Sequence, residues 1–322
     1  MPRTLPILLP AFLSACSPSE SRHDALPEER EILELRPNGS FVAALDHGLA
    51  RIDARSGRVL SRTAAGEIDD LLVVGERVLT FEIEPREEGG ALFARPLDLS
   101  STFALGSSAG VVRLGALGPS IIVFEEADGA RWREPDGPRS WWSPAPRSIF
   151  GSDTTLRALT RADGAFAIRS LRVVKGQPVV DVEPAPAFRS EDPRVVPVGS
   201  ALVPVEVVEK TLRVGDVDTG LPARDVVDVV SLGGSLAVLT ATPTRLVVGK
   251  PSGPFLSREL EGEPRYDPRR LSRSLVVVSP RRILVATTRR VVAVGVEVGS
   301  LVLDSGFAPH GAHAPIAGLF PG

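Results

Sequence analysis

Cysteine is almost absent from this chain of 322 residues, which contains one, Cys16. A single thiol cannot form a disulfide framework or a multi-cysteine metal site within one chain. An excess of charge is also lacking, since the net charge is −3, and this gives no reason to expect a nucleic-acid-binding protein. The 30 glycines and 29 prolines follow no three-residue period, which excludes a collagen. With 43% hydrophobic and 24% charged residues, the composition is that of a folded globular chain.

The N-terminal hydrophobic run is too short to cross a membrane. It extends from Leu5 to Leu13, whereas a transmembrane helix needs ~20 residues. Its length, and the positive Arg3 before it, are typical of a signal peptide. The run leads into Leu13-Ser14-Ala15-Cys16, which resembles the lipobox of bacterial lipoproteins. In that family the signal is cut before the cysteine, whose thiol then carries a lipid. The alternative is a plain secretory signal and a soluble, secreted protein.

The lipobox resemblance also implies a location. Residues 1–15 would be the signal peptide, and residues 16–30 the lipidated Cys16 followed by a polar, flexible tether. Ser17, rather than an aspartate, follows the cysteine, and by the sorting rule of that family this favours the outer membrane. The expected partners are the membrane, through acyl chains on Cys16, and another envelope protein, with no nucleic acid.

A helical period is absent as well. No stretch of a dozen residues keeps a 3.6-residue hydrophobic repeat, so we expect no substantial helix in the mature chain. Short β-branched runs bounded by Gly, Pro, Asp or Ser predict strands instead. The first group comprises Glu31–Leu35, Phe41–Leu45, Leu49–Asp53 and Arg58–Arg62. Four antiparallel strands in so few residues are typical of one β-propeller blade.

The turn after the third strand of this group recurs along the chain. It ends at Gly57, and its counterparts are the polar turn Asp98–Ser101 and Gly137, Gly176, Gly220, Gly253 and Gly299. The average spacing is about 40 residues, the length of one blade. We therefore predict an all-β, about seven-bladed propeller of four-stranded antiparallel blades over residues 31–308, followed by a C-terminal tail over residues 309–322. The alternative is two or three tandem β-sandwiches.

Two of these turns carry a more specific pattern. Asp53–Gly57 and Asp216–Gly220 read Asp-x-x-Ser/Thr-Gly, which resembles the repeat of quinoprotein-like β-propellers, and Trp141 stands at that family's blade-docking position after Gly137. A lipid-anchored propeller of this kind is similar to the lipoprotein propeller of the outer-membrane β-barrel assembly machinery. No cofactor is implied, because quinoprotein enzymes use a vicinal cysteine pair that this chain lacks.

Three local patterns resemble catalytic or metal sites but have simpler structural explanations. Gly106–Gly110 fits the nucleophile elbow Gly-x-Ser-x-Gly, yet a strand rather than a helix is predicted after it. Asp216–Gly220 lacks the glutamate that completes a calcium loop. His310 and His313 would need a third ligand to hold zinc, and no obvious one converges: His47 lies in a turn of the first predicted blade, although that blade adjoins the closing one. We therefore predict no catalytic residue and no metal site.

A non-catalytic, lipid-anchored interaction scaffold of the cell envelope is the function that these patterns favour. The alternatives are a lactonase- or lyase-like propeller enzyme, or a sugar- or ligand-binding protein, with a site at the central channel. An enzyme would gather three or more titratable groups at the channel mouth. The acids to inspect there are Asp46, Asp69, Asp70, Glu125 and Glu126.

Partner contacts are predicted from exposed tryptophans and arginines. Trp141 is expected in the core, whereas Trp132 and Trp142 are candidates for contact with a partner, since neighbouring strand residues face opposite sides. Residues 67–88 carry a net charge of −6 and residues 265–290 a net charge of +7, which favours an anionic partner. The alternative is that these charges are solvated turns. Turn alternation predicts that one rim holds Arg269, Arg270, Arg273, Arg289 and Arg290, with Arg281 and Arg282 on the other.

Overall fold

The computed structural model describes most of the chain after residue 38. The described residues are 39–83, 89–108, 112–117, 120–125, 129–134, 137–141, 146–152, 155–162, 164–175, 177–266 and 273–319. Cys16, the predicted signal peptide and the predicted tether lie outside them. Among the described residues, no helix is long and apolar enough to span a membrane.

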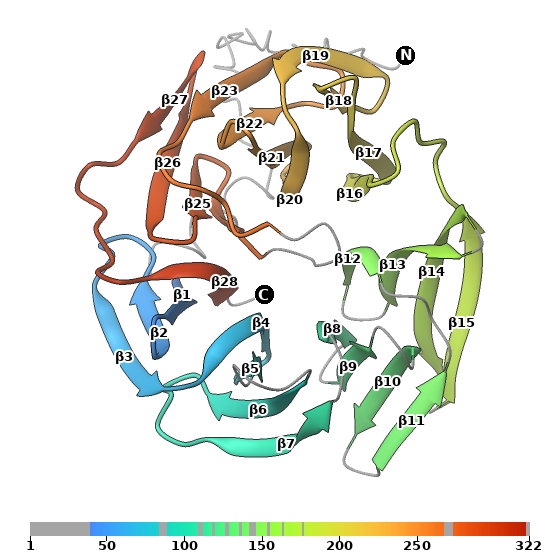
Figure 1. Ribbon diagram of the computed structural model, residues 1–322, viewed down its shortest axis with the longest axis vertical. Helices are drawn as coiled ribbons and strands as arrows, with labels where there is room; N and C mark the ends of the chain where they lie inside the picture. The colour runs from blue at the N-terminus through green and yellow to red at the C-terminus, as the bar shows by residue number, and fades with distance from the viewer. Residues whose placement is uncertain are drawn as a thin grey trace, which may run out of the picture.

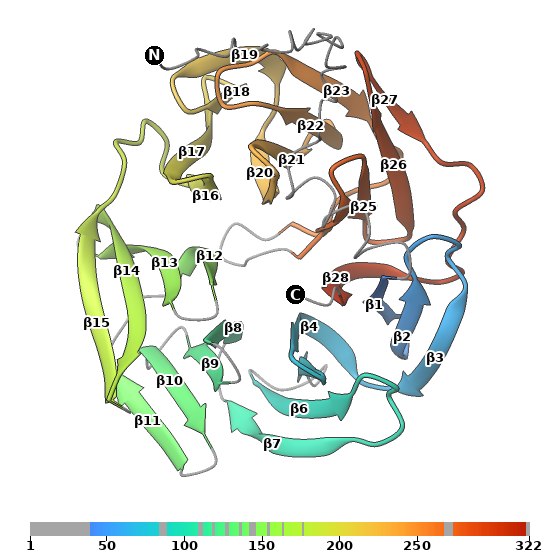
Figure 2. The same cartoon turned by 180° about the vertical axis from the view of Figure 1, so that it is seen from behind.

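The described strands form seven four-stranded antiparallel sheets, arranged as blades around a centre (Figures 1 and 2). From the innermost strand outward, blade 1 is β28 (His313–Leu319), β1 (Ser40–Leu45), β2 (Gly48–Asp53) and β3 (Val59–Ala64); blade 2 is β4 (Glu67–Val74), β5 (Arg77–Ile83), β6 (Gly90–Pro96) and β7 (Phe103–Ser108); blade 3 is β8 (Val112–Leu117), β9 (Ser120–Glu125), β10 (Gly129–Glu134) and β11 (Gly137–Trp141). Blade 4 is β12 (Pro146–Ser152), β13 (Thr155–Ala162), β14 (Ala165–Val174) and β15 (Gln177–Pro184); blade 5 is β16 (Arg194–Val198), β17 (Ala201–Val208), β18 (Thr211–Val214) and β19 (Val217–Pro222). Blade 6 is β20 (Asp225–Leu232), β21 (Ser235–Ala241), β22 (Arg245–Gly249) and β23 (Phe255–Glu259); blade 7 is β24 (Leu275–Ser279), β25 (Arg282–Ala286), β26 (Val291–Glu297) and β27 (Ser300–Leu303). The predicted fold class is thereby confirmed as an all-β propeller with four-stranded antiparallel blades.

Hydrophobic cores lie between blades rather than within them. The second strands β1 and β21 are buried at nearly every position, because a neighbouring blade covers each of their faces. Phe41 and Ile52 of blade 1 pack with Leu284 of blade 7, for example, and Leu79 of blade 2 packs with Leu114 of blade 3. Each of the seven core clusters of the described residues joins two adjacent blades. The ring is therefore held together by contacts that pass all the way round it.

The C-terminal segment closes this ring. β28 pairs with β1 in the register Ser40↔Leu319 to Ala43↔Ile316, so the chain's last strand is the innermost strand of its first blade. The predicted tail over residues 309–322 was therefore wrong. The place next to β1 that the sequence analysis assigns to Glu31–Leu35 is occupied by β28, and residues 31–35 themselves lie outside the described residues.

The predicted repeat turns at Gly57, Asp98–Ser101, Gly253 and Gly299 lie where the sequence places them, between the third and fourth strands of their blades. Gly57, Gly253 and Gly299 have φ values of 71°, 73° and 80°. This left-handed conformation carries no steric penalty in glycine. Gly220 also has a positive φ, but it lies within β19, because the hairpin turns earlier, at Gly215. Gly106 belongs to β7, and β8 follows it rather than the helix that a nucleophile elbow requires.

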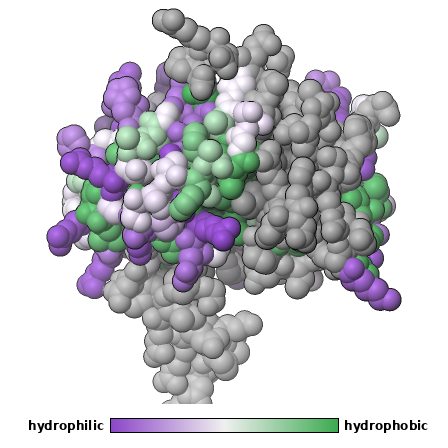
Figure 3. Space-filling view, turned by 90° about the horizontal axis from the view of Figure 1, so that it is seen from below, coloured by the Kyte–Doolittle hydropathy of each residue, from purple (hydrophilic) through white to green (hydrophobic). Residues whose placement is uncertain are grey.

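The outer wall mixes polar and apolar side chains (Figure 3). The outermost strands alternate between exposed and half-buried residues, as in β3 and β19, since only one of their faces packs on a blade. Several large apolar side chains are exposed on them, among them Leu60 on β3, Phe103 on β7 and Val182 on β15. These residues lie on different blades. The exposed apolar side chains of the described outer wall are therefore scattered and do not form one apolar patch.

Candidate functional site at the channel mouth

The innermost strands all begin on one face of the propeller, which we call the upper face. Three of them carry a β-bulge near their N-terminal end, where one extra residue disturbs the pairing with the second strand of the blade. The bulges lie between Ile68 and Asp70 in β4, between Pro146 and Ser148 in β12, and between Val226 and Asp228 in β20. A bulge bends the strand and redirects its side chains. The residue after each bulge binds the next blade.

These three side chains act as clasps between neighbouring innermost strands. Asp70 Oδ2 accepts the backbone N–H of Leu114 in β8 at 2.8 Å, and Ser148 Oγ accepts that of Val195 in β16 at 3.1 Å. Asp228 Oδ2 accepts the N–H groups of Ser274 and Leu275, at 2.7 and 2.8 Å. The clasps join blades 2 to 3, 4 to 5, and 6 to 7. They satisfy backbone groups that have no ladder partner at the start of a strand.

A cluster of opposite charges fills the mouth beside blade 2. Asp70 is 1% exposed, and its Oδ1 accepts Arg273 Nε at 2.8 Å. Asp69 Oδ1 lies 3.2 Å from Arg265 Nη2, and its Oδ2 lies 3.7 Å from Arg113 Nη1. Arg265 and Arg273 also donate to the carbonyls of Ile68 and Leu114. Buried charges require partners of this kind.

The two arginines that reach Asp69 and Asp70 come from the segment between β23 and β24. This segment leaves the outer edge of blade 6 and extends toward the centre of the ring (Figure 1). Its described residues contact the opposite side of the mouth at Ile68, Asp69 and Asp70. Two arginines of the basic stretch, residues 265–290, and two acids of the acidic stretch, residues 67–88, therefore meet inside the molecule. The complementary sign of the two segments was a signal of this contact that the sequence analysis assigned to an external partner.

A second group of charges holds the same segment on its other side. Tyr266 donates its hydroxyl to Asp192 Oδ2 at 3.1 Å. Asp192 Oδ1 lies 2.6 Å from Arg194 Nη1 and 3.3 Å from Arg147 Nη1. Burial and the carboxylates of Asp192 and Asp225 raise the pKa of Tyr266 above its usual range. The phenol is therefore a permanent hydrogen-bond donor that attaches the segment to blades 4 and 5.

Asp228 has the most perturbed carboxyl group of the mouth. Burial raises its pKa from 3.8 to about 6, against the hydrogen bonds of Ser274 and Leu275, which lower it. Asp228 also lines a cavity of about 270 Å³ between β12, β16 and β20. A raised carboxyl pKa in a cavity is a feature of catalytic acids. Here, however, Oδ1 accepts the N–H of Val229, and Oδ2 accepts two more.

The acids that the sequence suggested for the channel mouth do not all lie there. Asp69 and Asp70 lie at the mouth, as the enzyme alternative requires, and with Asp228 they make three carboxyl groups there. Each is engaged by arginine or by backbone N–H groups. Asp46 lies in an exposed turn, whereas the side chain of Glu125 and the whole of Glu126 lie outside the described residues.

The predicted partner contacts are only partly described. Trp132 and Trp141 lie in β10 and β11, whose side chains are outside the described part, as are Trp142, Arg269 and Arg270. Arg273 is not a rim residue, because its guanidinium is bound in the channel mouth. The turn between β25 and β26 carries Arg289 and Arg290 on the upper face, where Arg290 pairs with Glu261 at 2.9 Å. Arg281 and Arg282 lie in a turn at the lower face, and Arg282 pairs with Asp304 at 2.8 Å.

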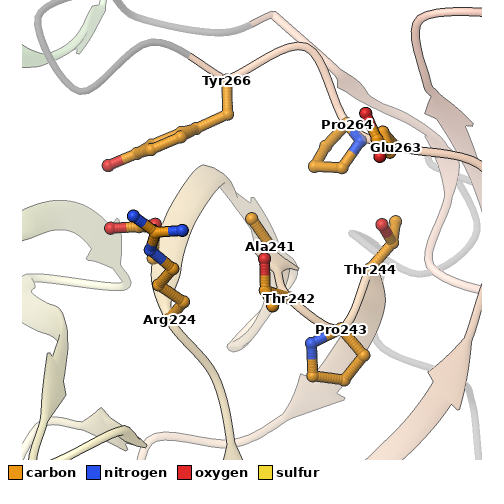
Figure 4. Close-up of a pocket in the computed structure, with 9 residues that line it drawn as sticks. Arg224, Ala241, Thr242, Pro243, Thr244, Glu263, Pro264 and Tyr266 are labelled. Atoms are coloured by element: carbon orange, nitrogen blue, oxygen red, sulfur yellow. The ribbon is translucent and has the colours of Figure 1, made fainter.

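Two larger cavities open on the upper face. One, of about 620 Å³, is lined by Asp46, His47, Glu67, Arg265 and His313 among others. It brings His47 and His313 to the same cavity, and His313 Nε2 lies 3.7 Å from Asp46 Oδ1. Within the described ranges, no group of three or more His, Cys, Asp or Glu side chains is arranged to hold a metal ion. The other cavity, of about 650 Å³, lies over blade 6 between Arg224 and Tyr266 (Figure 4).

Comparison with known proteins identifies a fold but no family. The sequence matches no protein-family model and no curated protein. Similar solved structures include a functionally unknown protein from Desulfotomaculum acetoxidans, with 12% identity and a TM-score of 0.60 over 88% of this chain and 100% of that chain. Hsv2 from Kluyveromyces lactis has 11% identity and a TM-score of 0.58 over 83% and 94% of the two chains. Apo AztD from Citrobacter koseri has 12% identity and a TM-score of 0.53 over 88% and 97%.

At these identities the likeness shows a shared β-propeller fold and nothing about activity. BamB from Moraxella catarrhalis is also among the similar structures, with 13% identity and a TM-score of 0.48 over 80% of this chain and 78% of that chain. A TM-score this low carries no argument about function. Any functional conclusion therefore has to come from the residues of this chain.

Proposed function

We propose that this chain is a lipid-anchored propeller of the cell envelope that binds a partner protein and does not catalyse a reaction. The observation that supports it is the internal use of the charges at the channel mouth. A catalytic acid or base needs a substrate within hydrogen-bond reach. Asp70 and Asp228 instead hold the starts of neighbouring blades, and Arg265 and Arg273 bind Asp69 and Asp70 at the mouth. The charged groups of the channel mouth therefore form a structural hub that holds the blades together. The upper and lower faces of the propeller remain for binding a partner.

The upper rim of blade 7 is the surface that we assign to the partner. Arg289 is exposed there, in a turn whose backbone N–H groups donate to the Thr287 hydroxyl and, at Thr288, to the Glu263 carbonyl. A rigid turn with an exposed guanidinium suits an acidic protein surface, since little conformational entropy is lost on binding. The partner in this proposal is an envelope protein with an acidic face.

Lipidation at Cys16 is the first element of the proposal to test. The full-length chain and Cys16→Ala are expressed in a bacterium with a labelled fatty acid. We expect the label and detergent-phase partitioning for the parent chain and the loss of both in the variant, because the thiol is the only site at which the lipid could be attached. Equal partitioning of the two proteins into the aqueous phase would contradict the anchor.

Partner binding is tested by photo-crosslinking of the full-length chain in its own host. A crosslinking residue replaces Thr288 on the upper face or, as a matched control, the fully exposed Val298 in the turn between β26 and β27 on the lower face. We expect a discrete protein adduct from position 288, reduced several-fold by Arg289→Glu. Adducts from position 298 alone, or none from either position, would refute the assigned rim.

A further inference from the structure

The cavity over blade 6 has the dimensions of a small-molecule site. Its volume of about 650 Å³ falls within the range of ~300–1,000 Å³ that is typical of ligand pockets. It lies between the turn that joins β21 to β22 and the segment that follows β23. It is lined by Arg224, Asp225, Ala241, Thr242, Pro243, Thr244, Glu263, Pro264 and Tyr266. Neither the charge cluster at the channel mouth nor the rim of blade 7 accounts for this lining of aromatic, hydroxyl and charged side chains.

One wall of the cavity is a fixed aromatic ring. Tyr266, the only tyrosine of the chain, lies across the cavity from Arg224 and Ala241 (Figure 4). Its hydroxyl donates to Asp192, which is itself held by two arginines. The ring is therefore anchored at its far end. An anchored ring offers a flat surface at little entropic cost to a ligand.

The polar groups of the cavity are mixed in charge. Arg224 supplies a guanidinium, whereas Asp225 and Glu263 supply carboxylates. Arg224 Nε lies 3.6 Å from Asp225 Oδ2, so the positive charge is already offset. A phosphate or other anion would meet two carboxylates and a single guanidinium. The lining thus disfavours an anionic ligand.

The same groups suit a neutral ligand with many hydroxyls. Thr242 and Thr244 add two hydroxyl groups, each of which both donates and accepts. A sugar hydroxyl also donates and accepts, and so can bridge a carboxylate and a guanidinium. The C–H groups on one face of a sugar ring are attracted to the negative face of an aromatic ring. An aromatic wall opposite an alternation of acids, an arginine and hydroxyls therefore matches a carbohydrate.

The backbone at Thr242 adds an independent observation. Its φ is 50°, although it is a β-branched residue, for which the left-handed region is strained. Such strain persists where the surrounding structure imposes it, and it is concentrated at ligand sites. Thr242 is exposed and lines the cavity. The turn is thus held in a costly conformation at the position where it contributes to the cavity.

We propose that this cavity binds a neutral carbohydrate, with the sugar ring against Tyr266 and its hydroxyls toward Arg224, Asp225 and Glu263. This site differs from the channel-centred site considered from the sequence, because it lies over blade 6. It borders the partner rim at Glu263, whose carbonyl accepts the Thr288 hydroxyl, but Arg289 does not line it, so either proposal can fail without the other.

The single tyrosine makes the first test direct. The full-length chain is produced with 13C in the tyrosine ring, so that its ring signals come from Tyr266 alone. Glucose, galactose, mannose, N-acetylglucosamine, cellobiose, maltose and chitobiose are titrated to about 10 mM, which is enough to detect a dissociation constant of about 1 mM. We expect at least one sugar to shift the Tyr266 signals in a saturable way. The absence of a saturable shift with every sugar, whether or not inorganic phosphate or dialanine gives one, would overturn the proposal.

Variants then test the wall and the polar groups by ligand-observed NMR. Tyr266→Ala and Arg224→Ala should each weaken the sugar by about three- to tenfold. Tyr266→Phe keeps the ring and should retain binding, which also covers the case in which Tyr266→Ala fails to fold. Arg289→Ala, on the same face but outside the cavity, is the matched control. Unchanged affinity in Arg224→Ala together with equal affinity in Arg289→Ala would overturn the assigned site.

Discussion

At the scale of single residues, polar side chains of one blade bind backbone N–H groups of the next blade. Asp70, Ser148 and Asp228 follow bulges in three innermost strands and accept N–H groups of the next blade. No sequence pattern predicts this role, because an Asp or Ser next to a hydrophobic run is equally typical of a turn. The strand positions could be predicted, but the contact partner, 44 to 47 residues away, could not.

The carboxyl group of Asp228 predicts a pH dependence of stability. Burial raises its pKa from 3.8 to about 6 in the folded protein, so between pH 4 and 6 the folded state holds a proton that the unfolded state releases. Stability should therefore fall by about 3 kcal/mol as the pH rises through this window and then show no further change from this group.

Asp228→Asn is the variant that isolates this effect. It should lower stability at pH 4, since an amide group replaces an oxygen that accepts backbone N–H groups, but it should flatten the slope between pH 4 and 6. Urea unfolding at pH 4, 5, 6 and 7 measures both quantities. An unchanged slope in the variant would contradict the raised pKa of Asp228.

Alanine substitutions at two turn glycines distinguish the cost of backbone strain from the cost of a steric contact. A Cβ at Gly57 would lie 3.1 Å from the backbone nitrogen of Ala308, whereas a Cβ at Gly299 would meet open space. Both residues have a positive φ, so an alanine at either position should cost about 1 kcal/mol or more. Gly57→Ala should cost measurably more than Gly299→Ala in denaturant midpoints. Equal costs would mean that the contact with Ala308 relaxes freely.

At the scale of elements, the repeat was readable and the closure was not. Gly57, Gly253 and Gly299 mark the turn before the outermost strand because that turn requires a left-handed residue. β28 was not predicted because His313–Leu319 contains a proline and three small residues, two alanines and a glycine, beside a Gly- and Pro-rich stretch. Its strand character comes from pairing with β1 rather than from local propensity.

Removal of β28 should therefore unfold the ring. A chain that ends at residue 308 would expose the inner edge of β1 and would remove Ile316, which is 1% exposed, from the cluster around Phe41. We expect loss of the cooperative unfolding transition, whereas Ile316→Ala should retain it and lower stability by about 2–5 kcal/mol. Circular dichroism on heating measures both. A truncated chain with the parent transition would show that β28 is dispensable.

At the scale of the whole molecule, charges far apart in the sequence hold the ring across its centre. Arg273 and Asp70 are 203 positions apart and belong to opposite halves of the chain. Their segments were predicted to be charged, and the sequence alone suggested an external partner for them, since charge runs usually face solvent. The pairing depends on the ring being closed, which is a global property that no local pattern contains.

The pair of Asp70 and Arg273 should therefore contribute far more to stability than a rim pair. Arg273→Met leaves the 1% exposed Asp70 without its guanidinium and should cost about 3 kcal/mol, because a buried charge that loses its partner is strongly destabilising. Arg290→Met breaks the more exposed contact with Glu261 and should cost less than about 1 kcal/mol. Chemical denaturation of both variants at pH 7 makes the comparison. Equal costs would show that water reaches Asp70 in the folded protein, and the channel mouth would then be an open site rather than the hub of the ring.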